Sequence, residues 1–146
     1  MNSNEPLEQA IEQLSSLDYV WFNTRFLVED VACVYAAFPE KLEFEAAIAS
    51  TMRVLKLIAA GRVDASVLKD DYEGWKSCHY QHRVGQGIKA DMRIMYQLID
   101  GVVRVRGFGE RRAPADFYWR MAGASRAALL AATEGEDGGQ SDSYEQ

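Results

Sequence analysis

Three arginines fall on two neighbouring segments of the chain that carry the alternating pattern of β-strands. Residues 91–99 and 102–108 are these segments, and the Asp-Gly pair between them is typical of a two-residue type I′ hairpin. In the register that such a turn sets, residues directly opposite each other share one face of the sheet. This register predicts one face that carries Arg93, Met95, Gln97, Arg104, Arg106 and Phe108.

The chemistry that this predicted face favours is anion binding. Three guanidinium groups on one exposed face repel one another unless an anion lies there, and phosphate accepts paired hydrogen bonds from a guanidinium. Phe108 would offer a ring on which a base can stack. The alternative is that the arginines pair with acidic residues elsewhere in the chain or stand in solvent. A slip of one residue in the register would invert the face.

The opposite face of the hairpin is apolar, so we expect it to pack against helices. Its members are Met92, Ile94, Tyr96, Leu98, Val103 and Val105. Apolar residues at helical spacing predict three helices before the hairpin, over residues 5–17, 29–38 and 40–60. An alanine-rich stretch after Pro114 predicts a last helix that runs to about residue 132.

β-Branched and aromatic residues predict two further strands, over residues 19–23 and 77–84. We therefore predict an α+β fold, in which a small, mostly antiparallel, twisted sheet packs on an N-terminal helical hairpin, with an extra helix at each end. The predicted organisation is a helical extension over 1–18, one α+β domain over 19–133 and a disordered acidic tail over 134–146. The first helix either adds a layer over the core or shields the basic face.

The composition of the chain excludes several classes of protein. The chain has 146 residues, of which 48% are hydrophobic and 26% charged, as is usual for one globular domain. Two cysteines without a C-x-x-C pair exclude a disulfide scaffold, and no apolar run approaches the roughly 20 residues of a membrane span. The net charge is −6, yet residues 76–120 hold nine basic and four acidic residues. This basic segment predicts attraction to polyanions, and we expect a cytoplasmic protein.

The order of these elements resembles the RelE/ParE toxin superfamily of type II toxin–antitoxin systems. The resemblance covers about residues 19–120, and its most specific part is MRIMYQLIDGVVRVRGFGERR, residues 92–112. The family shows there a strand with an arginine, an acidic-Gly turn, a hydrophobic strand and then Gly followed by basic residues. The resemblance implies a cytoplasmic toxin that a cognate antitoxin protein neutralises.

The resemblance also implies roles for particular residues. RelE-like members cleave mRNA on the ribosome through attack of a ribose 2′-hydroxyl on the adjacent phosphate, a reaction that needs cations and proton carriers. The strand arginine of the family falls on Arg93, its later basic residue on Arg111 or Arg112, and its C-terminal tyrosine on Tyr118. The basic residues of the preceding strand fall near His82 and Arg83.

Two other functions stay open. ParE-like members inhibit DNA gyrase without nuclease chemistry, and the same scaffold can serve as a non-catalytic interaction module. We expect neither a metal nor another cofactor. On a strand His79 and His82 point to opposite faces, and Cys78 and His82 lie about 13 Å apart at about 3.3 Å per residue, too far for one zinc ion. The oligomeric state is not predicted.

Overall fold

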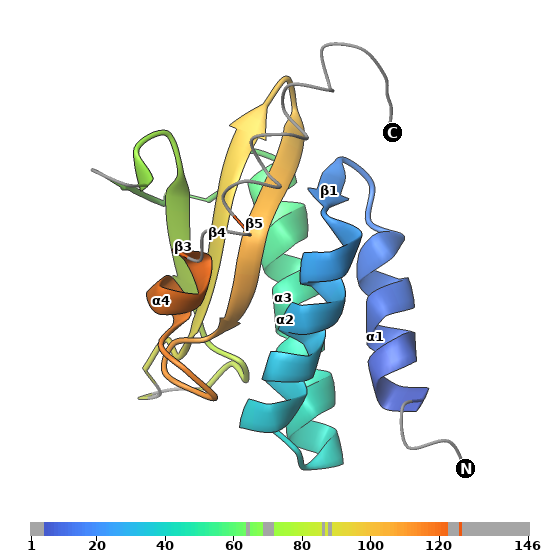
Figure 1. Cartoon of the computed structure of the whole chain (residues 1–146). Helices are drawn as coiled ribbons and strands as arrows, with labels where there is room; N and C mark the ends of the chain where they lie inside the picture. The colour runs from blue at the N-terminus through green and yellow to red at the C-terminus, as the bar shows by residue number, and fades with distance from the viewer. Residues whose placement is uncertain are drawn as a thin grey trace.

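The computed structural model describes residues 5–63, 65–68, 72–85, 87, 89–122 and 126. The fold is α+β, and helices flank a five-stranded sheet with the strand order β1-β5-β4-β3-β2 (Figure 1). The strands are β1 (Val20–Phe22), β2 (Ser66–Val67), β3 (Lys76–Tyr80), β4 (Met92–Ile99) and β5 (Val102–Glu110). β1 pairs with β5 in parallel and the other described pairings are antiparallel, so the sheet is mixed.

The helices agree with those predicted from the sequence, except at the N-terminal end of the second helix. They are α1 (Glu5–Ser15), α2 (Thr24–Ala37), α3 (Lys41–Ala59) and α4 (Phe117–Met121). α2 begins five residues earlier than the predicted Glu29, because the Asn23 side chain accepts a hydrogen bond from the Phe26 backbone N–H at 3.1 Å and caps the helix. Most of the predicted last helix and the predicted acidic tail lie outside the described residues.

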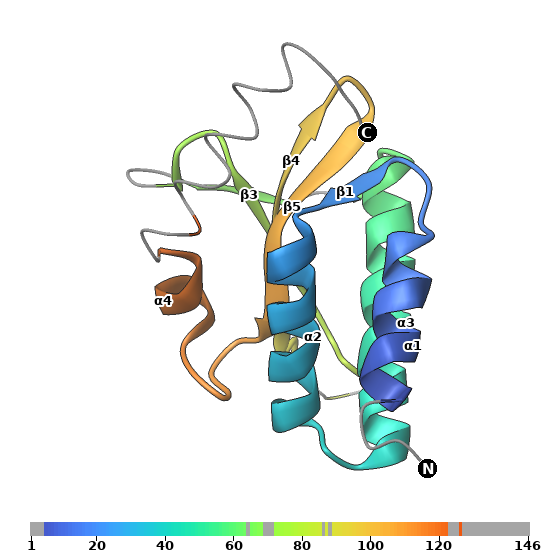
Figure 2. The ribbon, with the colours of Figure 1, turned by 45° about the vertical axis from the view of Figure 1, so that its right-hand side comes forward.

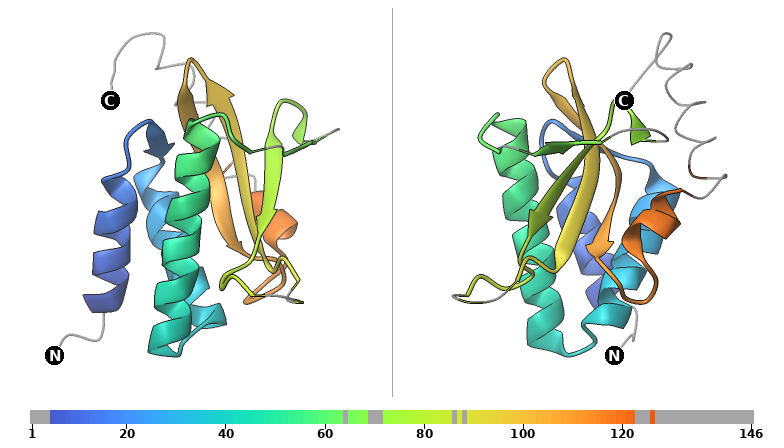
Figure 3. Two further views of the ribbon diagram at one scale, coloured as in Figure 1. Left: turned by 180° about the vertical axis from the view of Figure 1, so that it is seen from behind. Right: turned by 90° about the vertical axis from the view of Figure 1, so that its left-hand side faces the viewer.

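The elements form layers on the two sides of the sheet. α2 and α3 cover one face, α1 packs against α2 on the side away from the sheet, and α4 lies beyond the opposite face (Figure 2). The views from behind and from the side show the same order (Figure 3). The main core lies between the sheet and α2 and α3, and α1 adds Ala10 and Leu14 to it. α1 therefore does not shield the other face, and that interpretation is wrong.

The β4–β5 hairpin confirms the predicted turn but not the whole predicted register. Asp100 and Gly101 both have positive φ, 52° and 79°, as a type I′ turn requires. Gln97 lies opposite Arg104 as predicted, but a bulge follows and Met95 then lies opposite Gly107 instead of Arg106. The extra residue reverses the alternation beyond it. Phe108 consequently packs in the main core, fully buried, and the prediction that it offers a stacking surface is wrong.

Among the described residues, no helix is both long and apolar enough to span a membrane. The same residues include no group of three or more His, Cys, Asp or Glu side chains that could hold a metal ion.

Candidate functional site

The predicted basic face exists, but one end of it is covered. Arg104 is only 7% exposed, donates to the Gln97 side-chain oxygen at 3.1 Å and places its guanidinium 5.0 Å from the centre of the Trp21 ring. Such a contact between a cation and an aromatic ring stabilises a buried arginine. A buried guanidinium under an indole ring cannot receive a phosphate from solvent, so the predicted open role of Arg104 is wrong.

Arg106 is covered as well. It is 6% exposed, and its Nε and Nη2 donate to the Met121 carbonyl at 3.2 and 2.8 Å. The rings of Tyr72 and Trp75 lie 5.3 and 5.2 Å from its guanidinium carbon. Thus α4 and the residues before β3 cover this part of the sheet, which the sequence pattern predicted to be exposed. The predicted substrate contact by Arg106 is wrong for the same reason as that by Arg104.

The other end of this face brings together His79, Arg93 and Tyr118. His79 on β3 lies directly opposite Arg93 on β4, so both side chains stand on the same face of the sheet. The Tyr118 hydroxyl comes from α4, lies 3.5 Å from His79 Nε2 and shares a 2.8 Å hydrogen bond with the Ser77 hydroxyl. His79 is exposed, and Arg93 and Tyr118 are half-buried. This cluster is the candidate site.

Two members of the cluster, Arg93 and Tyr118, are held by contacts outside it. Arg93 donates from Nη1 to the carbonyls of Ala90 and Met92, at 2.8 and 3.0 Å, so its guanidinium is held near the start of β4. The Tyr118 carbonyl accepts the Tyr72 hydroxyl at 2.8 Å, which attaches α4 to the segment before β3. Arg93 and Tyr118 are therefore positioned before any ligand arrives.

The electrostatics of the cluster favour a neutral imidazole. Partial burial lowers the pKa of His79, and the nearby positive charge of Arg93 lowers it further. A neutral imidazole can accept a proton near pH 7, a guanidinium can hold an anion, and a phenol hydroxyl can donate a proton. The arrangement therefore suits acid–base chemistry on an anionic substrate.

The predicted residue His82 has a different position. Its Nδ1 bonds to Asp91 Oδ2 at 2.6 Å and its Nε2 to Glu43 Oε1 at 2.9 Å, and its ring stacks on Phe38 with centroids 4.2 Å apart. Burial opposes protonation, but the hydrogen bonds to Glu43 and Asp91 outweigh it and raise the pKa of His82. Both ring nitrogens bond to carboxylates of the fold, so His82 lies outside the cluster and its acid–base role stays a prediction.

The remaining predicted residues, Arg83, Arg111 and Arg112, lie outside the cluster. Arg83 forms an ion pair with Glu43 at 2.6 Å, which connects it to α3 and not to the cluster. Arg111 and Arg112 lie on the connection between β5 and α4, where the Arg111 N–H donates to the Asp91 carbonyl at 2.9 Å. Arg112 is exposed and Arg111 half-buried. They stay candidates for contact with a polyanion.

The sequence analysis missed the position of His79 beside Arg93 and Tyr118, because it considered His79 only as a metal ligand. Strand pairing was the one signal that could have identified it, because a strand that pairs with β4 in antiparallel fashion can place a histidine opposite Arg93. That register depends on contacts between segments that the sequence pattern does not fix.

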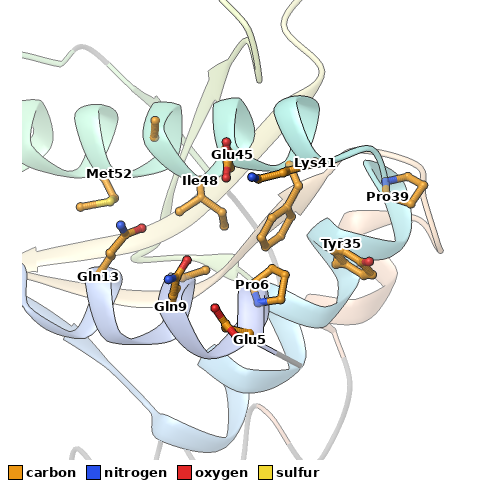
Figure 4. Close-up of a pocket in the computed structure, with 13 residues that line it drawn as sticks. Glu5, Pro6, Gln9, Gln13, Tyr35, Pro39, Lys41, Glu45, Ile48 and Met52 are labelled. Carbon is orange, nitrogen blue, oxygen red and sulfur yellow. The ribbon is translucent and has the colours of Figure 1, made fainter. Parts of the chain in front are cut away.

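A groove of about 590 Å³ lies between α1 and α3 (Figure 4). Ala10, Phe44 and Ile48 contribute its apolar surface, and Glu5 and Lys41 contribute charged groups. Its lining contains no histidine or cysteine, and it lies among the helices, on the other side of the sheet from α4 (Figure 2). The groove is therefore separate from the candidate site.

Comparison of the chain with protein-family models, with curated proteins and with solved structures found no match.

Proposed function

We propose that this chain is a RelE-like toxin, an endoribonuclease that cleaves ribosome-bound mRNA at the cluster of His79, Arg93 and Tyr118. The single observation that carries the proposal is the composition of the cluster. An imidazole whose pKa is lowered lies beside a guanidinium and a phenol hydroxyl on the accessible end of this face of the sheet. The element order adds support, because a strand, a helical hairpin and a three-stranded meander follow one another as in that superfamily.

The cluster can divide the reaction among its members. His79 takes the proton from a ribose 2′-hydroxyl, whose oxygen then attacks the adjacent phosphorus. The Arg93 guanidinium neutralises the charge that develops on the phosphate oxygens. Tyr118 donates its hydroxyl proton to the leaving 5′-oxygen, and Arg111 and Arg112 add positive charge near the RNA backbone. The products are a 2′,3′-cyclic phosphate and a 5′-hydroxyl.

The proposal includes a partner and a compartment. The protein acts in the cytoplasm, and a cognate antitoxin protein neutralises it by covering the cluster. A covering antitoxin would exclude RNA from His79 and Arg93, because both stand on the face that the helical hairpin leaves accessible.

One observation favours a second candidate function, a non-catalytic interaction module. Arg104 and Arg106 are buried beneath aromatic rings, so fewer cations face the solvent than a large polyanion site would use. A ParE-like protein that inhibits DNA gyrase by binding would fit the same reduced charge. Neither alternative needs the imidazole of His79.

Regulated expression in a bacterium separates these functions. We expect the wild-type chain to halt growth and translation and to create new mRNA 5′ ends. His79→Ala should abolish all three effects, whereas Arg53→Ala, at an exposed position on α3, should leave them intact. Toxicity with intact mRNA and altered DNA supercoiling would replace the nuclease by the gyrase inhibitor. Absence of toxicity would leave the interaction module.

A further inference from the structure

A buried carboxylate on α2 holds α4 and Arg126 against the sheet. Asp30 is 1% exposed, and both of its oxygens are engaged. Its Oδ1 accepts from Arg120 Nη1 at 2.8 Å, and its two oxygens accept from the Arg126 guanidinium at 3.1 Å each. Its Oδ2 also accepts the Phe108 backbone N–H at 3.2 Å. One side chain thus joins α2, β5, α4 and Arg126.

The two arginines reach this carboxylate by crossing close over β5. Arg126 Nη1 donates to the Arg106 carbonyl at 2.7 Å, and Arg120 Nη2 donates to the Phe108 carbonyl at 3.4 Å. The Arg120 side chain is 8% exposed, so its charge is almost fully removed from water. A buried charge is stable only with a partner, which gives the arginine a strong preference for this one position.

Two glycines of β5 make the crossing possible. A Cβ at Gly109 would lie 2.4 Å from Arg120 Nη2, and one at Gly107 would lie 2.3 Å from the Met121 terminal methyl. Any larger residue would therefore displace the side chains that cross the strand. The sequence Gly107-Phe108-Gly109 consequently serves the close packing of α4 and Arg126 against β5.

The helix α4 also carries Tyr118, a member of the candidate site. Tyr118 lies two residues before Arg120 within α4, a helix of a little more than one turn. The fixed position of Arg120 therefore limits where the Tyr118 hydroxyl can lie. Tyr72 and Ser77 make the remaining contacts with Tyr118, at its carbonyl and its hydroxyl.

We propose that Asp30 and Arg120 are positioning residues that set the Tyr118 hydroxyl against His79, an inference that rests on the proposed function for its catalytic consequence. Neither residue is among the groups that hold the substrate in the proposed reaction. They act through α4, whose docking both places the proposed proton donor and reduces the exposure of the imidazole. Loss of their contact lets α4 move while the His79–Arg93 pair on β3 and β4 stays in register.

The test uses the full chain and two readouts. NMR titration measures the pKa of His79, one of only two histidines, and cleavage of mRNA on programmed ribosomes measures activity. In Arg120→Ala we expect the pKa of His79 to rise toward the ordinary 6.5, because α4 no longer excludes water from it, and cleavage to fall about 10²-fold. Arg120→Lys, which keeps the charge, should recover part of both.

Controls separate positioning from chemistry. Tyr118→Phe keeps the ring and the docked helix, so it should lose activity with the His79 pKa still low. Arg53→Ala, an exposed arginine on α3, should change neither readout. If Arg120→Ala does not fold, Gly109→Ala replaces it, since that change displaces the guanidinium without removing a charge.

The outcomes test the positioning role of Arg120 separately from the proposed nuclease function. Unchanged His79 pKa and unchanged cleavage in a folded Arg120→Ala variant would overturn the positioning role. If wild type cleaves no RNA but the His79 pKa still rises in Arg120→Ala, the proposed function fails and the positioning of α4 stands.

Discussion

The central residue of the site is His79, whose properties depend on the residue across from it. Arg93 lies opposite His79 on the neighbouring strand, and its positive charge disfavours a second positive charge on the imidazole. The same guanidinium is proposed to bind the phosphate. In the proposed reaction, one pair of side chains therefore supplies both the anion site and the neutral base.

Arg93→Gln separates these two effects. We expect the pKa of His79 to rise, because the repelling charge is removed and burial alone continues to lower it. NMR titration of the imidazole measures this change, and His82, which is not paired with Arg93 in the sheet, serves as the internal reference. A His79 pKa that stays the same would show that the charge of Arg93 does not reach the imidazole.

His82 gives the fold a dependence on pH of its own. Its pKa is raised above the ordinary 6.5, so its contribution to stability is complete below that pH and is lost as the pH rises through the folded-state pKa. The His82 hydrogen bond lowers the pKa of Glu43 below 4.5, so the Glu43 contribution is lost as the pH falls through that lowered value. The Glu43–His82–Asp91 network is therefore most stabilising between about pH 4.5 and 6.5.

His82→Gln tests this dependence. We expect the difference in unfolding free energy between wild type and His82→Gln to shrink as the pH rises from 6.5, because deprotonation removes the same charge that the substitution removes. Urea unfolding at several pH values measures it, and the titration of His79 cancels in the difference. A difference that is constant with pH would show that the pKa of His82 is the same in the folded and unfolded states.

The candidate site could be predicted only in part from the sequence. Arg93 and Tyr118 were identified, and both lie in the cluster. His82 was preferred over His79 because the imidazole type is readable but its hydrogen-bond partners are not. Glu43, which engages His82, lies 39 residues away in the sequence, on α3.

At the scale of elements, local signals were reliable and long-range contacts were not. The Asp100-Gly101 turn follows from residue type alone, since both positions need positive φ. The bulge at Arg106 has no such local signature, and it moved Phe108 into the core. The covering of Arg104 likewise depends on Trp21, an aromatic residue that is distant in sequence.

Two neighbouring carboxylates on α2 give a matched comparison for the docking of Arg126. Both pair with Arg126, but the Asp30 side chain is 2% exposed and the Glu29 side chain 52%. We expect Asp30→Asn to lower the unfolding free energy by about 3–5 kcal/mol, because it leaves buried guanidinium charge without its partner. Glu29→Gln should cost less than about 1 kcal/mol, as for other exposed ion pairs.

Urea unfolding of the two variants provides the measurement. Equal losses in Asp30→Asn and Glu29→Gln would show that burial does not distinguish the two pairs. A small loss in both would show that the contacts of Arg120 and Arg126 with α2 contribute little to the stability of the fold.

At the scale of the whole molecule, the sheet separates two environments. The helices α1, α2 and α3 bury the main core on one side, and α4 lies on the other (Figure 2). The cluster of His79, Arg93 and Tyr118 belongs to the side of α4, which carries Tyr118. The net charge of −6 therefore does not describe the surface that a polyanion would meet. Arg104 and Arg106 are covered on that side of the sheet, and the proposed reactive groups lie at its more accessible end.

The most direct measurement is the end-group chemistry of RNA cut on programmed ribosomes by the purified chain. Attack by the 2′-hydroxyl predicts a 2′,3′-cyclic phosphate on one product and a 5′-hydroxyl on the other. Cleavage should disappear in His79→Ala and at a nucleotide that lacks its 2′-hydroxyl. Products with 5′-phosphate ends, or equal cleavage by His79→Ala, would contradict the assignment of the chemistry to this cluster.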